Sequence, residues 1–516
     1  MANSRTIAVV TTTIVSVLSR LASLASQIIV GLFLTDDEIG TFAVALGITG
    51  LTGLLRTGGI AQVLAGMQKP ELEKQASACL SWAITFTFLA VALTLGVAGA
   101  APALSGVLDN LGLPGLASVL CVMAMRQALV PFSVLARARL SVERRFVTIA
   151  KVDAVNALGR VAITLLIATR GGGTMALVVP YLAQIVVDAA VLGALGGLRR
   201  SDLRPNRGEV WALRKTLFWP IAIAALASTR TDIIYLVLGI TIPAAALGIF
   251  YFAYQLANQP TMLLASALQN VLAPYQADDR GNQAAERKGL ELVLAGAMLF
   301  VPVTTIATAS LFPSLELLVW GGRWAGAYDC LLFLSIGSTY ATVSALLTGP
   351  LLGLRRFKAL TMFEGTRIMG TVGGGAIGAI VVMIGDERFA SGSTEASIIG
   401  ASVGLSMAIV AIGQLVWVMR TAGTDWNEII RNMIFGPTLA VLTALAAQSI
   451  GHSIRESLDM PAGRLGAAIE FLSVTTVYVG LITLAIRFTA EPTLRETIGA
   501  MPAPTARLLK RLLVLR

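Results

Sequence analysis

The chain has 516 residues, of which 56% are hydrophobic and only 13% charged, and its mean hydropathy is +0.78. A soluble domain carries about 25% charged residues, so the composition excludes an ordinary soluble fold and predicts an integral membrane protein. The net charge of +10 raises the question of a nucleic-acid partner, which the positions of the cations answer below.

Hydrophobic segments follow one another along almost the whole chain. A membrane-spanning helix needs about 20 mostly apolar residues. Fourteen segments qualify, near residues 7–34, 41–66, 77–101, 113–136, 146–169, 174–197, 216–240, 244–270, 289–313, 328–352, 360–384, 395–419, 429–450 and 465–486. The expected fold is an all-α integral membrane protein with about 14 transmembrane helices.

Basic residues gather in alternate loops between these segments. With the N-terminus inside, 28 of the 39 Lys and Arg residues fall in cytoplasmic segments and five in external loops. In this count Arg137 and Arg139 belong to a cytoplasmic loop after the fourth helix. Retention of cations in cytoplasmic loops sets membrane topology, so we expect both termini to be cytoplasmic and no nucleic-acid partner.

The cysteines and the single histidine give no sign of a metal centre. Cys79, Cys121 and Cys330 are scattered among predicted helices, and His452 falls in a predicted external loop. No spacing matches a metal site or a disulfide framework. We therefore expect neither a metal nor a cofactor.

Six arginines remain inside the predicted spans: Arg20, Arg56, Arg126, Arg160, Arg230 and Arg367. Each would cost about 2.5–3.5 kcal/mol at the bilayer centre on insertion scales, so they must face protein or water rather than lipid.

Polar residues with helical spacing share a face with these arginines. The stripes are Ser16, Arg20, Ser23 and Gln27; Thr52 and Arg56; Asp153, Asn156 and Arg160; Tyr181, Gln184 and Asp188; and Tyr251, Gln255 and Asn258. Several helices therefore turn a polar face toward a common interior, and we expect Arg230 to line it as well.

Neutralisation by a neighbouring acid is the alternative explanation for each of these charges. Glu364 and Arg367 are spaced i,i+3 and can pair, whereas Arg230 and Asp232, spaced i,i+2, cannot pair on their own helix. A functional role is favoured for the arginines that have no acid within a turn or two on their helices, namely Arg20, Arg56 and Arg126.

Two motifs occur twice at nearly the same offset. "QIIVGLFLTDDEIGTF" and "DIIYLVLGITIPAAALGIF" place Gly40 and Gly248 208 residues apart. "RRFVTIAKVD" and "RRFKALTMFE" lie 211 residues apart and end on Asp153 and Glu364. The two matches indicate two homologous halves of six helices each, which enter the membrane from the same side because six is even.

The repeat sets the predicted domain boundaries. They are an N-terminal six-helix bundle at 1–198, a basic cytoplasmic linker at 199–216, a C-terminal six-helix bundle at 217–421, and an extra helix pair with a basic cytoplasmic tail at 422–516. In transporters that are built from two repeats, the substrate site lies between the repeats near the midplane of the membrane, and one half rocks against the other.

Three stretches carry a family resemblance that covers most of residues 10–420. They are the opening hairpin with its Leu-x-x-x-Glu-x-Gly-x-Phe turn, "TDIIYLVLGITIPAAALGIFYFAYQLANQPTMLLASALQNVLAPY", and "WGGRWAGA". In these the sequence resembles the Wzx-type oligosaccharide and polysaccharide flippases of the multidrug/oligosaccharidyl-lipid/polysaccharide (MOP) exporter superfamily.

The resemblance implies a flippase rather than an enzyme. It would move undecaprenyl-diphosphate-linked oligosaccharides across the bacterial inner (plasma) membrane for surface polysaccharide, such as lipopolysaccharide or exopolysaccharide, by alternating access around a cationic cavity. Membrane lipid, a polysaccharide polymerase and chain-length proteins would be its further partners. Guanidinium groups bind phosphate bidentately, so Arg20, Arg56 and Arg126 are the predicted diphosphate clamp.

Carboxylates are the candidates for coupling transport to H⁺ or Na⁺, since an acid enters a moving half only when it is neutralised. The candidates are Asp153, Asp188, Asp232 and Glu364.

Two other functions stay open. A membrane glycosyltransferase or polymerase is suggested by "TDDE" at 35–38, but the predicted external loops are short for an acceptor site. A drug exporter of the same superfamily would share the two bundles without needing several arginines for a cationic drug. The last two helices could line a groove for a lipid tail or simply pack on the bundle.

Overall fold

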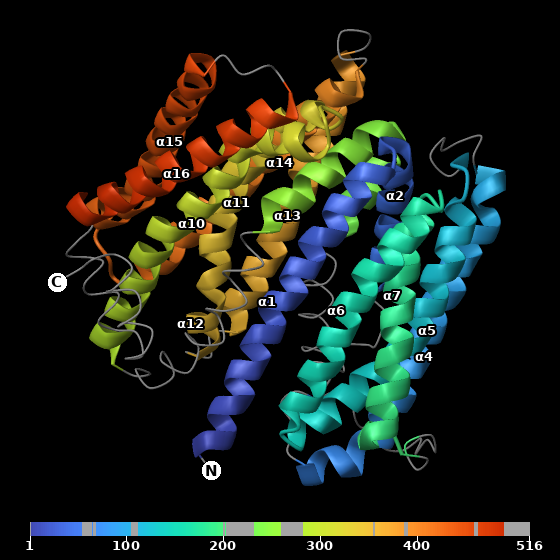
Figure 1. Cartoon of the computed structure of the whole chain (residues 1–516). Helices are drawn as coiled ribbons and strands as arrows, with labels where there is room; N and C mark the ends of the chain where they lie inside the picture. The colour runs from blue at the N-terminus through green and yellow to red at the C-terminus, as the bar shows by residue number, and fades with distance from the viewer. Residues whose placement is uncertain are drawn as a thin grey trace. The chain divides into compact units, whose positions relative to one another are not determined.

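The computed structural model describes residues 2–53, 64, 69–104, 112–199, 202, 232–259, 282–353, 357–385, 391–458 and 463–489. All regular elements in these ranges are helices, as Figure 1 shows. The predicted all-α membrane fold is therefore confirmed. The chain divides into two compact units, Met1–Tyr251 and Phe252–Arg516.

The first unit is built from long helices, one of which continues into a π-helical segment. Its described elements are α1 (Ala2–Phe33), α2 (Asp36–Gly53), α4 (Lys69–Leu104), α5 (Leu116–Val142), α6 (Phe146–Thr169), α7 (Met175–Val187), the π-helix η3 (Asp188–Gly197), a helix at 232–239 and the start of another at 244–259. Within the unit α1 packs along α6, α4 along α5, and α7 along both α5 and α6.

The second unit continues the helix at 244–259 and adds eight further elements. They are α10 (Gln283–Val319), the short 3-10 helix η5 (Ala325–Ala327), α11 (Tyr328–Leu346), α12 (Thr348–Gly353), α13 (Phe357–Gly385), α14 (Gly392–Thr421), α15 (Trp426–Ser457) and α16 (Arg464–Thr489). Here α14 packs against both α11 and α13.

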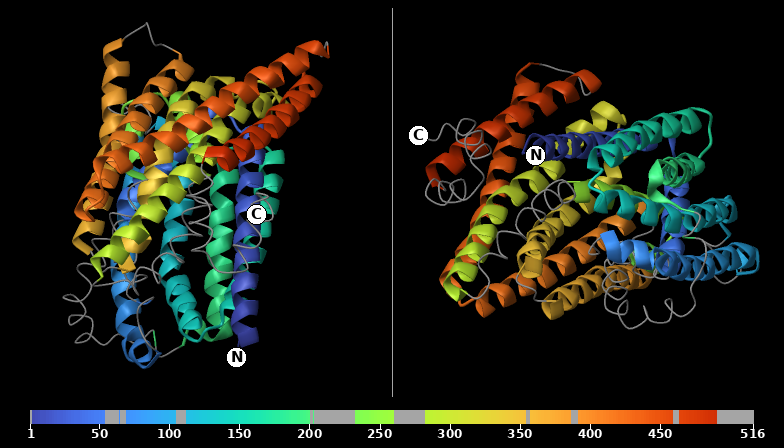
Figure 2. Two further views of the ribbon diagram at one scale, coloured as in Figure 1. Left: turned by 90° about the vertical axis from the view of Figure 1, so that its left-hand side faces the viewer. Right: turned by 90° about the horizontal axis from the view of Figure 1, so that it is seen from below.

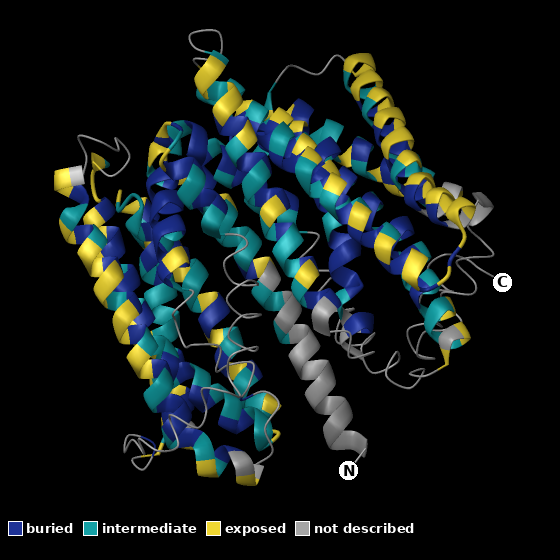
Figure 3. Cartoon of the chain, turned by 180° about the vertical axis from the view of Figure 1, so that it is seen from behind, coloured by how far each residue is buried: buried dark blue, intermediate teal, exposed yellow. Residues whose placement is uncertain are grey.

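Ten of the described helices are long and apolar enough to cross a membrane. They coincide with ten of the fourteen predicted segments, and the other four, at 7–34, 41–66, 216–240 and 244–270, each include residues or side chains outside the described part. Large apolar side chains such as Phe88, Leu158 and Leu472 are more than half exposed. In Figure 3 such exposed positions recur along single faces of the helices, as expected of surfaces that contact lipid.

The acidic motif at 35–38 starts α2. The backbone N–H of Thr35 donates to Glu38 Oε2 at 2.9 Å, and the Glu38 N–H donates to Thr35 Oγ1 at 3.3 Å. This reciprocal pair is a capping box. The negative charges of Asp36, Asp37 and Glu38 are also stabilised by the positive end of the helix dipole. Local helix capping thus accounts for the residues that suggested a transferase, and the described residues contain no acidic, histidine or cysteine cluster suited to a metal.

A close helix crossing joins the two copies of the glycine motif. A Cβ atom on Gly40 would collide with the carbonyl of Ala244, and one on Gly248 would collide with the carbonyl of Asp36. Ala244 follows Asp36 by 208 residues, the same offset that separates the two glycines. Each glycine therefore contacts the same position of the other copy of the motif, as expected for an internal repeat.

The helix at 232–239 also belongs to the first unit. Gly47 lies against the backbone of Tyr235 and Leu236, and Gly50 lies against the side chain of Asp232. The compact unit therefore ends at Tyr251, later than the repeat, and the domain boundaries at 199–216 stay a prediction because most of that linker lies outside the described residues.

The last two helices pack against α10. Tyr478 Oη on α16 donates to the carbonyl of Val303 at 2.8 Å, and Gln448 Nε2 on α15 donates to that of Ser310 at 2.9 Å. Gly436 on α15 approaches the backbone of Met298 so closely that a Cβ would collide with it. Figure 2 shows α15 and α16 side by side, and these contacts attach the extra helix pair firmly to the second unit.

The crossing at Gly40 predicts a position-specific loss of stability. We expect Gly40→Ala and Gly248→Ala each to cost about 1–3 kcal/mol, because the new methyl group must push two backbones apart. Gly53→Ala is the matched control, since it lies on the same helix α2 with open space around it. Thermal unfolding of the purified protein in detergent would measure this, and equal melting temperatures for Gly40→Ala and Gly53→Ala would contradict it.

Candidate functional site

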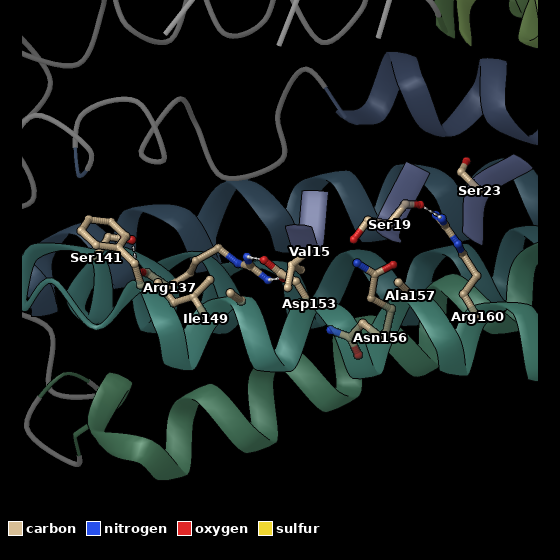
Figure 4. Close-up of a pocket in the computed structure, with 13 residues that line it drawn as sticks. Val15, Ser19, Ser23, Arg137, Ser141, Ile149, Asp153, Asn156, Ala157 and Arg160 are labelled. Atoms are coloured by element: carbon tan, nitrogen blue, oxygen red, sulfur yellow. Dashed lines mark hydrogen bonds and ion pairs between the residues drawn. The ribbon is translucent and has the colours of Figure 1, made fainter. Parts of the chain in front are cut away.

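A polar cavity of about 450 Å³ lies within the first unit, between α1, α5, α6 and α7. Figure 4 shows its lining, with Arg137 at one end and Arg160 at the other. Hydrogen-bonding groups of Ser23, Asn156 and Gln184 also face it. Among the described lining residues Asp153 is the only acid, so the walls mostly offer hydrogen-bond donors and positive charge.

Arg137 is the centre of an ion-pair cluster at this cavity. Its Nη1 and Nη2 atoms donate to the two carboxylate oxygens of Asp153, at 3.1 and 2.7 Å, in the bidentate geometry that suits a guanidinium. Nη2 also donates to Asp188 Oδ2 at 3.1 Å. One cation thus serves two anions, and the three side chains together carry a net charge of −1.

Asp188 is the fixed member of this cluster. It is the first residue of η3, where α7 widens from α-helical to π-helical winding, a feature often found at functional sites. Its second oxygen accepts a hydrogen bond of 2.7 Å from Asn156 Nδ2, and only 8% of its side chain is exposed. Asp153, by contrast, is 34% exposed and lines the cavity.

Two further arginines converge on one aromatic ring. The guanidinium carbons of Arg126 and Arg160 lie 5.4 and 5.9 Å from the centre of the Tyr181 ring, within cation–π range. Arg160 also donates to the carbonyl of Ser19 at 3.4 Å, and its Nε is buried with no hydrogen-bond partner. Neither arginine forms a salt bridge with a carboxylate of the described residues, although Asp232 acts electrostatically on Arg126.

Arg137 and Arg139 belong to a helix rather than to a loop. Both lie inside α5, which extends to Val142, rather than in a loop after residue 136. Arg139 is 1% exposed and pairs with Asp202 at 2.8 Å and with Glu73 at 3.6 Å. Acids from other helices compensate both arginines, and the topology count stays a prediction.

Several predicted site residues fall outside the description. The side chains of Ser16 and Arg20, and the whole of Arg56 and Arg230, are among them. The diphosphate clamp and the part of the cavity assigned to these residues therefore stay predictions.

The other predicted cavity residues are distributed over both units. Ser23, Asp153 and Arg160 do line the cavity of Figure 4. Gln27 and Tyr251 are half-buried in the first unit, and Gln255 and Asn258 are half-buried at the start of the second. Asn258 Nδ2 donates to the carbonyl of Tyr254 at 2.8 Å, one turn earlier on its own helix.

Thr52 has a packing role in the structure. It is buried, and its hydroxyl lies 2.9 Å from that of Thr94 and accepts a hydrogen bond of 3.2 Å from Gln127 Nε2. These bonds link α2, α4 and α5 through satisfied polar groups. Thr52 does not line the cavity of Figure 4, so that cavity offers no support for its predicted lining role.

The second unit contains a closed counterpart of the ion pair. Arg367 Nη1 donates to Glu364 at 2.7 Å, Nη2 donates to Ser344 Oγ at 3.0 Å, and Nε donates to Gln414 at 3.3 Å. The predicted neutralisation of Arg367 by Glu364 is confirmed. Glu364 follows Asp153, and Arg367 follows Asn156, by the same 211 residues that separate the two Arg-Arg-Phe motifs.

Arg137 is the site residue that sequence analysis missed. The polar stripes predicted on the next two helices contain two acids, Asp153 and Asp188, but only one arginine, Arg160. This imbalance indicates that a second cation lies nearby. Extending the fourth span by two turns would have provided the second cation. This extension is possible because α5 is 27 residues long.

The buried pair at Arg139 predicts a stability difference. We expect Arg139→Met to cost about 3–5 kcal/mol, because it strands the carboxylate of Asp202 away from water. Arg199→Met should cost less than about 1 kcal/mol, since Arg199 pairs with Glu73 at the surface with 48% of its side chain exposed. Thermal unfolding in detergent checks this, and similar losses for both variants would show that Arg139 is not the main anchor.

Comparison with known proteins agrees with a transport fold. The family model "Polysaccharide biosynthesis protein" matches residues 29–329, more than half of the chain. No curated protein matches the sequence.

Two solved structures are similar over most of their length. The lipid II flippase MurJ in its inward closed conformation matches with a TM-score of 0.64 and 12% identity, covering 92% of this chain and 98% of that one. An inward-facing multidrug resistance MATE family transporter of the MOP superfamily matches with a TM-score of 0.54 and 14% identity, covering 80% and 98%. These likenesses show a shared fold. The chain thus belongs to the polysaccharide biosynthesis protein family and is a multi-pass membrane protein with the fold of MOP-type transporters.

Proposed function

We propose that this protein is a flippase that moves undecaprenyl-diphosphate-linked oligosaccharides from the inner to the outer leaflet of the bacterial inner membrane. The observation that carries the proposal is the cavity in the first unit, lined by Arg137 and Arg160 in a helical membrane protein of a polysaccharide biosynthesis family. A diphosphate is the part of such a substrate that most needs compensation at membrane depth, and arginine provides it bidentately.

The diphosphate clamp is proposed for Arg20, Arg56 and Arg126. Arg126 supports it, because its guanidinium lies over Tyr181 without a carboxylate salt bridge among the described residues. Arg20 lies on α1 one residue after Ser19, whose carbonyl accepts from Arg160, so the backbone brings Arg20 to the same level of the unit.

Ion coupling is proposed for the acids around Arg137. One arginine cannot neutralise both Asp153 and Asp188, so their net charge of −1 favours binding of a proton or a sodium ion. Asp232 remains a further candidate because it acts on Arg126. Glu364 is the weakest of the four, because its charge is already balanced by Arg367.

The cavity favours the flippase over its alternatives. Arg160, which forms no carboxylate salt bridge among the described residues, disfavours a cationic drug, and the TDDE motif of the transferase hypothesis caps α2 instead. We place both termini in the cytoplasm on the basic-loop count. We also propose a polysaccharide polymerase and chain-length proteins as downstream partners, since flipped units need assembly.

The deciding experiment uses cells that lack the gene. Undecaprenyl-linked oligosaccharides would be extracted and their sidedness tested in spheroplasts with a membrane-impermeant sugar-oxidising label. We expect accumulated units that are protected from the label. Accumulated units that react with it would point to a polymerase or ligase, and a lack of accumulation would favour the drug exporter.

The clamp predicts separate effects on export and on insertion. We expect Arg20→Ala and Arg56→Ala each to reduce polysaccharide export at least about tenfold, the equivalent of one lost charge-assisted contact of about 1.4 kcal/mol. The Lys variants should retain part of the export because they keep the charge. Export is measured in complemented cells and membrane insertion by immunoblot, and normal export in both Ala variants would refute the clamp.

The coupling proposal predicts a difference between the two units. Asp188→Asn should abolish the dependence of transport on a proton or sodium gradient, because Arg137 and Asp153 then balance without a bound cation. Glu364→Gln should leave that dependence in place. Uptake of a fluorescent polyprenyl-diphosphate sugar into proteoliposomes, with and without each gradient, tests this. Coupling that survives Asp188→Asn would exclude the cluster as the coupling site.

A further inference from the structure

We propose that the Asp153 carboxylate binds Arg137 where a phosphate of the substrate would bind. The diphosphate of a polyprenyl carrier displaces this carboxylate in the first step of binding. Arg137 would then be a substrate-binding residue that is kept covered until a carrier arrives. This inference rests on the proposed flippase function, and it assigns a role to a residue outside the predicted clamp.

Arg137 remains oriented when Asp153 leaves. Its Nη2 is also bonded to Asp188, which is 8% exposed and held in turn by Asn156. This second contact keeps the guanidinium at the cavity wall without help from Asp153. A group that stays in place at no extra ordering cost is a preorganised binding group.

Asp153 has the features of a replaceable partner. It meets Arg137 with two parallel hydrogen bonds, the geometry that a phosphate also adopts on a guanidinium. Both side chains line the cavity and are about one-third exposed, 35% for Arg137 and 34% for Asp153. A pair this exposed is only weakly stable, so a doubly charged ligand can compete for the arginine.

The remainder of the cavity suits the anion that would enter. Arg160 stands at the far end with a buried Nε that has no hydrogen-bond partner, and Ser23 and Gln184 add neutral polar groups. Figure 4 shows Arg137 and Arg160 toward opposite ends of the cavity, with Asp153 and Asn156 between them. Two cations at the two ends of one cavity can be engaged in turn by a diphosphate that moves through the unit.

The second unit shows what a permanent pair looks like. Arg367 is 7% exposed, and Ser344 and Gln414 occupy its other donors in addition to Glu364. An incoming anion would have to break a satisfied, enclosed network there. We therefore assign the exchange of carboxylate for phosphate to the first unit. Substitution of Glu364 serves as a control, because it also removes an acid that neutralises an arginine.

The test measures binding of farnesyl diphosphate to the purified full-length protein in nanodiscs by isothermal titration calorimetry. We expect Asp153→Asn to tighten binding about tenfold, because the competing carboxylate is gone. Arg137→Gln should weaken binding at least about tenfold, with Arg137→Lys intermediate and still folded. Glu364→Gln should leave the affinity unchanged.

Asp188→Asn separates displacement from general electrostatics. It removes the same charge as Asp153→Asn, at nearly the same distance from Arg137. A long-range charge effect would tighten binding in both variants. The proposal expects tightening only for Asp153→Asn, because Asp188 holds the arginine in place. Equal tightening, or no change with Asp153→Asn, would overturn it.

Two further ligands identify the source of the diphosphate. Inorganic pyrophosphate should bind more weakly than farnesyl diphosphate if the site serves a lipid carrier, and equal affinity would overturn that assignment. Failure of the displacement is distinguishable from failure of the flippase function. If wild-type protein binds farnesyl diphosphate and gene deletion traps shielded carrier, but Asp153→Asn changes nothing, the flippase stands and the role of Asp153 falls.

Discussion

Pairing of charge at membrane depth is the constraint on which this structure depends. A guanidinium that faces lipid is costly, and five described arginines on these helices lie against protein or the polar cavity. Arg139 and Arg367 meet acids in enclosed networks, Arg126 and Arg160 share the ring of Tyr181, and Arg137 is held by two acids. The helices that supply these partners must keep a fixed register, because a shift of one residue would turn an acid toward lipid.

The two units resolve the same requirement in different ways. In the second unit, Arg367 is balanced by one acid and saturated by a hydroxyl and an amide. In the first unit, Arg137 has one acid too many and an open cavity beside it. Asp153 and Glu364, which the two Arg-Arg-Phe motifs place 211 residues apart, are thus a cavity-lining acid in one unit and a member of a closed network in the other. The proposed transport activity draws on this asymmetry.

The helical segments could be predicted well because hydropathy is a local property. Ten predicted spans match described helices, and the pairing of Glu364 with Arg367 followed from their i,i+3 spacing. The candidate site was predicted only in part. Ser23, Asp153 and Arg160 were found from helical stripes, but Arg137 was not, because its partners Asp153 and Asp188 come from other helices. The predicted fourth span also ended at residue 136, directly before Arg137, although α5 continues to Val142.

The glycine crossing restricts which residues the two copies of the motif can accept. Gly40 and Gly248 each leave room for the backbone of the other copy of the motif, so a single contact depends on both halves. A larger residue in either half damages an approach that the other half also uses, and neither copy can drift independently. This self-facing contact therefore ties the two copies of the motif to each other, and both copies have Gly-x-Phe at this place.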